Sequence, residues 1–408
     1  MLRFGAHRCA GLRALHGAGL VLGFWIPSQA GPAPSLLLHR VFSALLTVAF
    51  VGQSLFSLYM TVCFTVDGYV TGVLYAVSLI TVLKHLFSIV YFQIRRNRLV
   101  QIFAELQVVM DKYNYPFVDL QRMARRVSFR SFVIYFLLPS AYIVLMRSNT
   151  ISLVEIVRNP AENNATEIFS LNQSLGTFRR DFHRFFNHHS ENLFRVAIFV
   201  STMSNLREIA ANAFLMTAYL IIAEQMEILT ECLRRILWPP HFLKVDRIFG
   251  QKFGKSAVNL EVWQEFQQKT ARVLDEINRF SSPITVISIG SYVALLTLSA
   301  FALTKMFSEP EFATNFMTGC ILYLTEIYLY CEVGHRIKKQ ADAMGDVIFH
   351  GPWLRLEAHV VPVVHFLSLD CQRSFSAVGG PFFTLSLEFF ATVVGAFFTY
   401  FIVAVQIK

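Results

Sequence analysis

The chain has 408 residues, of which 54% are hydrophobic and only 15% are charged, and its mean hydropathy is +0.48. Soluble domains carry about 25% charged residues, so this composition excludes an ordinary cytoplasmic enzyme and also excludes disorder. The formal net charge of +9 would suit a nucleic-acid binder. We expect no nucleic-acid partner, however, because the basic residues lie between apolar runs long enough to cross a bilayer. The composition indicates an integral membrane protein.

Seven apolar runs of roughly 20 residues predict seven transmembrane helices. They are residues 41–66, 69–94, 131–146, 196–223, 281–304, 312–331 and 382–407. The third run is short and contains Pro139, so it is the weakest of the seven. The predicted fold class is therefore all-α, a polytopic membrane protein.

Four of these runs carry charged side chains, which are costly inside a bilayer, and Glu326 and Glu388 are the charged residues of the last two. Arg207 and Glu208 are neighbours in the fourth run, where they could form a structural ion pair or offer a polar contact to a ligand. Lys84 lies about 22 Å along its helix from Tyr69 at 1.5 Å per residue. That distance puts it near the predicted inner interface, and we expect its side chain to snorkel towards the headgroups.

Lys and Arg are distributed unevenly between the loops. The N-terminal segment and every second loop after it hold 26 of the 36 residues, whereas the alternate loops hold 8. Because cytoplasmic loops are the basic ones, we predict a cytoplasmic N-terminus and, with seven crossings, an extracellular C-terminus. This orientation is opposite to that of a G-protein-coupled receptor.

Two glycosylation sequons agree with this orientation, because Asn164 and Asn172 both fall in the loop placed outside. All six cysteines avoid that loop, so no disulfide framework is expected there. The N-terminus offers a competing interpretation, since three arginines precede a short apolar patch at residues 18–26, as in a signal peptide. Cleavage there would invert the topology and move 26 basic residues to the wrong side.

The predicted cytoplasmic segments carry apolar residues at helical spacing. Such stripes occur in residues 101–110 and in residues 260–277, and the second leads straight into the fifth run. They could be helices on the membrane surface, or inner extensions of the spans that pack together. Residues 332–373 add a third segment of this kind, so we predict a cytoplasmic helical anchor.

The last run carries the clearest functional pattern. Its polar or small residues are Glu388, Thr392, Gly395, Thr399 and Gln406, with Val403 at the edge of the same stripe. At about 100° per residue they lie within roughly 60° of one another, and the other faces are aromatic or aliphatic. The stripe could pack on other helices, with Gly395 allowing a close approach, or it could line a pore shared by four or five copies.

In the pore interpretation each residue of the stripe has a role. Val403 is a hydrophobic constriction that closes by dewetting, and Gln406 is a ring of dipoles at the outer mouth. Glu388 is a ring that attracts cations on the inner side, and Thr399 lies between the two ends of the stripe. These are the parts of a simple, poorly selective cation channel.

Three stretches resemble the insect odorant and gustatory receptor superfamily. Residues 379–388 with 399–406 resemble its terminal span, Gly23 to Pro27 resembles a short N-terminal motif, and Cys331-Glu332 with Trp353 resembles the connection before the last span. The resemblance implies a tetrameric ligand-gated cation channel with an intracellular N-terminus and a pore-lining last helix. It also implies a gate at Val403 and a polar ring at Gln406.

The chain also departs from parts of that family. It ends Ile407-Lys408 as the odorant co-receptor does, yet the loop between spans four and five lacks the long insertion typical of that co-receptor. It therefore resembles an odorant receptor with an ancestral-type last helix, assembling as a homotetramer or with a co-receptor. The expected segments are residues 1–331 with spans one to six, 332–380 as the anchor, and 381–408 as the pore helix.

The same resemblance implies that a small, volatile organic ligand binds in the outer half of the bundle. Candidate residues at that depth are Tyr75, Leu79, Tyr142, Met146, Met203, Arg207, Phe316, Met317 and Cys320. For each aromatic residue or methionine, ordinary helix packing is the alternative. The other expected partners are permeant cations and membrane lipid, at the plasma membrane of sensory neurons.

Other function classes have weaker support. The sequence contains no metal-ligand spacing, nucleophile elbow or phosphate loop, so neither enzyme activity nor a cofactor or metal is expected. A transporter would carry paired broken helices and internal symmetry, whereas the one evident break is Gly379-Gly380-Pro381. A gustatory receptor channel gated by a tastant stays open as an alternative.

Overall fold

The computed structural model of the chain describes residues 41, 44–45, 47–52, 69–112, 129, 133–134, 176–237, 257–305, 310–351, 361–371 and 375–406. Its long helices are α3 (Tyr69–Lys112), α6 (Gly176–Leu237), α7 (Ala257–Lys305) and α8 (Pro310–Phe349). They are followed by α9 (Val361–Cys371), the strands β1 (Val378–Gly379) and β2 (Phe383–Thr384), and α10 (Leu387–Gln406). The described chain is thus helical apart from one small hairpin, as its composition predicts.

Five of the seven predicted spans fall on described helices, namely α3, α6, α7, α8 and α10. Three stretches are long and apolar enough to cross a membrane by length and composition: Leu206–Leu237, Val262–Thr304 and Leu387–Gln406. The spans predicted at 41–66 and 131–146 lie largely outside the described residues, as do the sequon residues Asn164 and Asn172.

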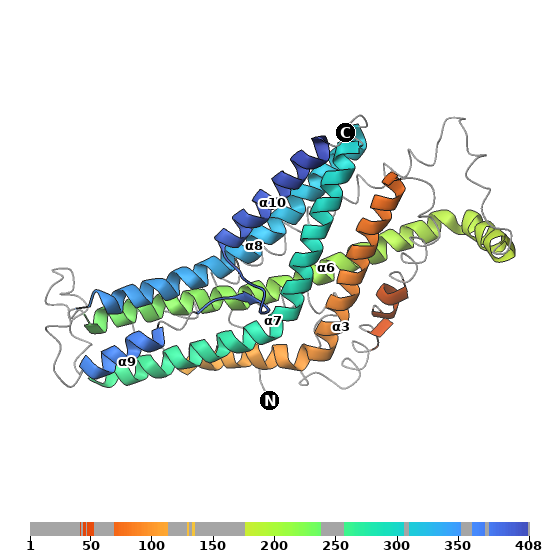
Figure 1. Ribbon diagram of the computed structural model, residues 1–408. Coiled ribbons are helices and arrows are strands. Elements are labelled where there is room, and N and C mark those ends of the chain that lie inside the picture. Colours follow the sequence, from red (N-terminus) through yellow and green to blue (C-terminus); the bar gives the residue numbers. More distant parts are fainter. Residues whose placement is uncertain are drawn as a thin grey trace.

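The four long helices exceed the length of a membrane crossing, because they have 44, 62, 49 and 40 residues and a crossing needs about 20. Figure 1 shows how they use the extra length. The N-terminal parts of α3 and α8 and the C-terminal part of α7 form an upper bundle with α10 (Figure 1). Their other parts continue into a lower bundle that also contains α9 and the C-terminal part of α6 (Figure 1).

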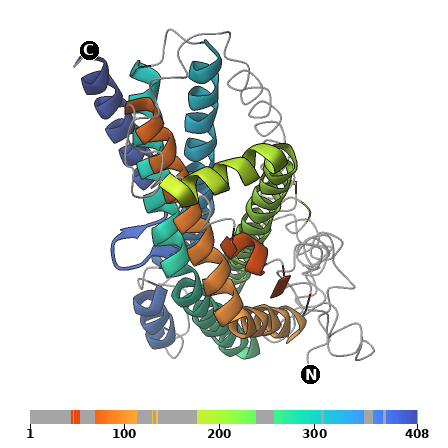
Figure 2. The same ribbon diagram turned by 90° about the vertical axis from the view of Figure 1, so that its right-hand side faces the viewer.

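Both α6 and α7 change direction along their length. α7 turns between the lower and the upper bundle (Figure 1) and contains Pro283 near its middle. Proline lacks the N–H that would continue the helical ladder and clashes with the preceding turn, which bends a helix. The N-terminal part of α6 also runs in a different direction from the rest of that helix (Figure 2).

The lower bundle buries the two apolar stripes predicted from periodicity. On α3, Leu106 is 1% exposed, and on α7 the side chains of Trp263 and Phe266 are completely buried. The Trp263 indole Nε1 donates a hydrogen bond to the Leu229 carbonyl of α6 at 2.8 Å, so the one polar group of the buried ring has a partner. Of the two interpretations of these stripes, the structure therefore supports helices that pack together.

Candidate functional site

A short hairpin leads into the last helix. Strands β1 and β2 pair antiparallel with Gly379 opposite Phe383, and Gly380 has a φ of 63°, a conformation that favours glycine. A Cβ added to Gly379 would lie 2.1 Å from the Phe383 ring, so only glycine leaves room for that ring. The Gly379-Gly380-Pro381 break in the sequence is therefore the bend of this hairpin.

The last helix begins with a defined N-cap. Ser386 Oγ accepts a hydrogen bond from the Phe389 backbone N–H at 3.2 Å, which satisfies one of the free donors of the first turn. The Leu385 N–H donates to the Ala377 carbonyl at 2.9 Å. α10 thus begins at Leu387, a little after the predicted start at 382, because Phe383–Thr384 pairs as a strand first.

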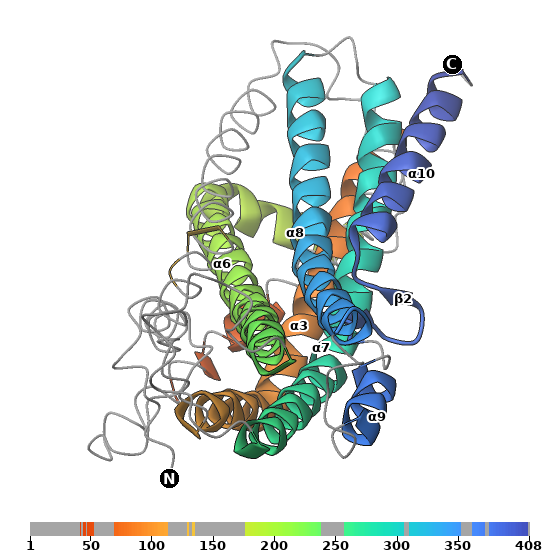
Figure 3. The ribbon, with the colours of Figure 1, turned by 90° about the vertical axis from the view of Figure 1, so that its left-hand side faces the viewer.

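One face of α10 packs against α7 and α8, and the rest faces away from the protein (Figure 3). Phe389, Phe390 and Val393 pack against the core, and the Phe390 ring meets the Tyr328 ring of α8 edge-on at 5.4 Å. All 20 residues of this apolar helix are exposed or half-buried. In a membrane, lipid or another protein surface must cover such a helix, because the rest of this chain covers only one of its faces.

The predicted polar stripe lies on the uncovered side of α10. Its exposed residues are Glu388, Thr392, Gly395, Thr399, Val403 and Gln406. At about 100° per residue, the centre of this stripe lies opposite the centre of the packed face. The hydroxyls of Thr392 and Thr399 donate to the carbonyls four residues earlier, at 2.9 Å in each case. The two threonine hydroxyls of the stripe are therefore satisfied within α10 itself.

Glu388 has a basic neighbour that the sequence did not indicate. The Lys338 ammonium of α8 lies 3.2 Å from Glu388 Oε2, and the two side chains are 43% and 75% exposed. The residues are 50 positions apart, so no helical spacing could have predicted this pair. The contact ties the first turn of α10 to the C-terminal half of α8.

Asn278 of α7 links three elements beneath the last helix. Its Nδ2 donates to the Ser376 carbonyl at 2.9 Å, and its Oδ1 accepts from the Tyr219 hydroxyl of α6 at 3.0 Å and from the Val378 N–H at 3.4 Å. The Tyr219 hydroxyl also lies 2.5 Å from Ser281 Oγ. The hairpin that starts α10 is therefore held by hydrogen bonds to Asn278 of α7, and Tyr219 of α6 in turn holds Asn278.

The charged residues of the bundle pair differently from the prediction. Glu208 of α6 contacts Lys84 Nζ at 3.1 Å and His85 Nε2 at 2.5 Å, both on α3. The Lys84 ammonium also lies 4.3 Å from the centroid of the Tyr292 ring of α7, and Lys84 is only 7% exposed. The snorkelling expected for Lys84 is therefore wrong, because its counter-ion lies inside the bundle.

Arg207 does not pair with Glu208, so the predicted ion pair between these neighbours is also wrong. Consecutive residues of a helix point about 100° apart and do not face each other. Arg207 is 2% exposed, and its Nη1 donates to Thr47 Oγ1 at 3.3 Å. Its guanidinium carbon lies 5.7 Å from the centroid of the Phe50 ring, within the range of a cation–π contact.

The predicted ligand residues lie on three of the described helices. Leu79 of α3 and Met203 of α6 are half-buried, Cys320 of α8 is buried, and Met317 of α8 is 51% exposed. The side chains of Tyr75 and Phe316, and all of Tyr142 and Met146, lie outside the described part of the chain. A pocket formed by these residues stays a prediction.

The sequence profile of the 7tm Odorant receptor family matches residues 65–398, which is most of the chain. The chain belongs to this family. It is thus a multi-pass membrane protein of a family of receptors, not of enzymes.

Relatives of known sequence match smaller segments of the chain. The odorant receptor coreceptor of Anopheles gambiae is 26% identical over 149 residues, which cover 36% of this chain and 31% of the coreceptor. Odorant receptor 22c of Drosophila melanogaster is 24% identical over 185 residues, or 43% of each chain. The chain therefore aligns with about a third of the coreceptor's length and less than half of the other receptor's.

The fold is shared with a solved receptor. The structure of the insect olfactory receptor OR5 from Machilis hrabei matches with a TM-score of 0.73 and 14% sequence identity, covering 97% of this chain and 98% of that one. A second structure of the same receptor, in complex with eugenol, matches with a TM-score of 0.70. At this identity the likeness concerns the fold alone.

Proposed function

We propose that the chain is a chemosensory receptor that forms a ligand-gated, non-selective cation channel opened by small, volatile organic molecules. The observation that carries the proposal is the last helix, whose polar stripe lies exposed opposite its packed face. If copies of α10 stand around a common axis, this arrangement turns the stripe towards a water-filled pore while the aromatic faces contact protein and lipid. The family assignment supports the same function.

The stripe assigns a role to each pore residue. Val403, which is 44% exposed, forms the hydrophobic constriction, with Gln406 beyond it at the outer mouth. Thr399 lines the path below the constriction. Glu388 attracts cations at the inner end, where its contact with Lys338 holds the carboxylate near the base of the pore.

The assembly is a homotetramer or a heterotetramer with a co-receptor. The odorant receptor coreceptors among the relatives support an assembly of several chains. A small organic ligand is supported by the eugenol complex of the Machilis hrabei receptor. In this chain the ligand would lie among α3, α6 and α8, near Leu79, Met203 and Cys320. The plasma membrane of sensory neurons is the expected location.

Val403→Ala is expected to raise the resting current severalfold, because a smaller side chain widens the constriction and lets water stay in it. Val405→Ala is the matched control, since Val405 has a similar exposure of 47% but lies on another face of α10. Patch-clamp recording of both variants in the absence of ligand is the measurement. A resting current that rises equally in both variants, or in neither, contradicts a gate at Val403.

The proposed topology has a cytoplasmic N-terminus and an extracellular C-terminus, with Asn164 and Asn172 glycosylated outside. An epitope tag after residue 408 is expected to label on intact cells, and a tag before residue 1 only after permeabilisation. Flow cytometry of the two tagged chains under both conditions measures this. A C-terminal tag that labels only after permeabilisation would reject the orientation, and loss of the N-terminal tag from the same chain would favour a cleaved signal peptide.

A further inference from the structure

The exposed face of α3 changes character along its length. Its large exposed apolar residues are Leu83, Val90 and Ile94, of which Ile94 is 73% exposed, and one more, Val108, lies near the C-terminal end of the helix. The next exposed residues on that side are Asn97, Gln101 and Glu105. An exposed face that switches from aliphatic to polar within one turn marks the level at which a helix leaves the hydrocarbon and meets the headgroups.

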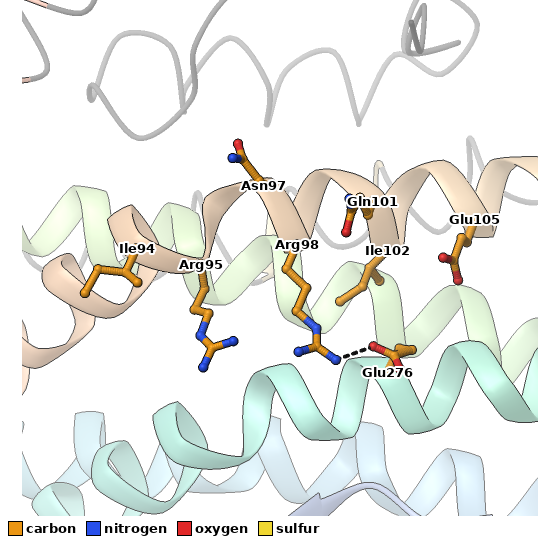
Figure 4. Close-up of a pocket in the computed structure, with 8 residues that line it drawn as sticks. All are labelled: Ile94, Arg95, Asn97, Arg98, Gln101, Ile102, Glu105 and Glu276. Carbon is orange, nitrogen blue, oxygen red and sulfur yellow. Dashed lines mark hydrogen bonds and ion pairs between the residues drawn. The ribbon is translucent and has the colours of Figure 1, made fainter.

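A groove lies at this level. It has a volume of about 510 Å³, extends along α3 from Ile94 to Glu105, and reaches Glu276 on α7. Figure 4 shows the side chains of Arg95 and Arg98 extending from α3 towards α7 within it. The groove therefore places two guanidinium groups just beyond the apolar surface formed by Val90 and Ile94.

The end of the groove next to Ile94 is basic, because its acidic residues are either paired or far from that end. Glu276 is shared by two arginines, because Arg98 Nη2 donates to its Oε2 at 2.7 Å and Arg279 Nη1 lies 3.7 Å from its Oε1. The hydrogen bond with Glu276 also raises the pKa of Arg98 above its usual value. Glu105 lies about 15 Å along the helix from Arg95 at 1.5 Å per residue, at the far end of the groove.

Arg95 is the group without a protein partner. Among the residues that the structure describes, its guanidinium has neither a hydrogen bond nor an ion pair, although it lines the same groove as the engaged Arg98. A guanidinium presents a planar fork of donors that matches phosphate oxygens bidentately. Arg96 follows directly in the sequence, and clusters of basic residues just beyond a membrane span attract anionic lipids.

We propose that the groove between α3 and α7 binds the phosphate headgroup of an anionic phospholipid. Arg95 contacts the phosphate and Arg98, held by Glu276, stands beside it. The acyl chains lie along the exposed Val90 and Ile94. The adjoining apolar face is the reason to assign a lipid and not a soluble phosphate. If the proposed topology is correct, this lipid belongs to the cytoplasmic leaflet, whereas the binding itself does not depend on channel activity.

The test measures lipid binding to the full-length purified protein by native mass spectrometry, with short-chain phosphatidylinositol 4,5-bisphosphate as the probe. Arg95→Gln is expected to weaken the apparent affinity about fivefold, the effect of one arginine near an anionic surface. Arg95→Lys keeps the charge but loses the planar fork, so it should lie between Arg95→Gln and the unchanged chain. Arg234→Gln at the end of α6 is the control, because it also removes one arginine and Arg234 pairs with Glu231 on α6, outside the groove.

Several results would overturn the proposal. One is an unchanged affinity in both Arg95 variants, and another is an equal loss in Arg234→Gln, which would indicate non-specific attraction. Soluble inositol 1,4,5-trisphosphate binding as tightly as the lipid would reject the lipid as the occupant. Equal binding of phosphatidylcholine would reject an anionic headgroup. If Arg95→Gln fails to fold, weaker binding by Arg95→Lys than by the unchanged chain decides the question.

Discussion

Gly334→Ala is expected to displace the start of α10 and destabilise the chain. A Cβ at this position of α8 would lie 2.3 Å from the Leu385 carbonyl oxygen and 2.4 Å from the Leu385 Cβ. The hairpin has little freedom to retreat, because Leu385 bonds to Ala377 and Asn278 holds both Ser376 and Val378. Overpacking costs typically about 1 to 3 kcal/mol, and a clash with backbone should lie at the upper end of that range.

The same helix supplies the control for this experiment. Gly345→Ala introduces the same methyl group at a position of α8 where, apart from the adjoining backbone of the helix itself, no atom lies within 4 Å, so it should leave the protein unchanged or slightly stabilise it. Thermal unfolding of the two purified variants, read with their size-exclusion profiles, makes the comparison. If Gly334→Ala melts at the temperature of the unchanged chain, the close crossing at Leu385 is not what positions α10.

Glu208→Gln is expected to lower the free energy of unfolding by about 3 to 5 kcal/mol, the cost of breaking a buried ion pair from one side. Lys84 would be left without its counter-ion while 7% exposed. The contact with the Tyr292 ring cannot replace a carboxylate, since cation–π contacts contribute roughly 2 kcal/mol even when desolvated. Thermal or denaturant unfolding in detergent measures the loss.

Two further variants separate the charge effect from packing. Adding Lys84→Met to Glu208→Gln removes both charges and should restore much of the stability, because a buried pair replaced by neutral groups is often tolerated. Glu265→Gln removes an exposed pair with Lys269 and should cost less than about 1 kcal/mol. If Glu208→Gln costs no more than Glu265→Gln, the buried pair does not stabilise the bundle.

Much of the fold was predictable from local patterns. The apolar runs predict the helices now described as α3, α6, α7, α8 and α10, because the length of a run and its period are properties of neighbouring residues. The stripes at 101–110 and 260–277 predict buried helix faces for the same reason. The polar stripe from Glu388 to Gln406 could likewise be predicted from the turn of about 100° per residue alone.

The pairing of residues on different helices was decided by the tertiary structure. Glu208 is adjacent to Arg207 in sequence, yet it pairs with Lys84 and His85 on another helix. Lys338 contacts Glu388, which lies 50 positions away in the sequence. Position 334 requires a glycine because Leu385 of the folded chain passes close to it. The period of a helix determines which of its residues share a face. Which residues of other helices contact that face depends on how the helices bend and cross, and the packing of the whole chain sets these angles.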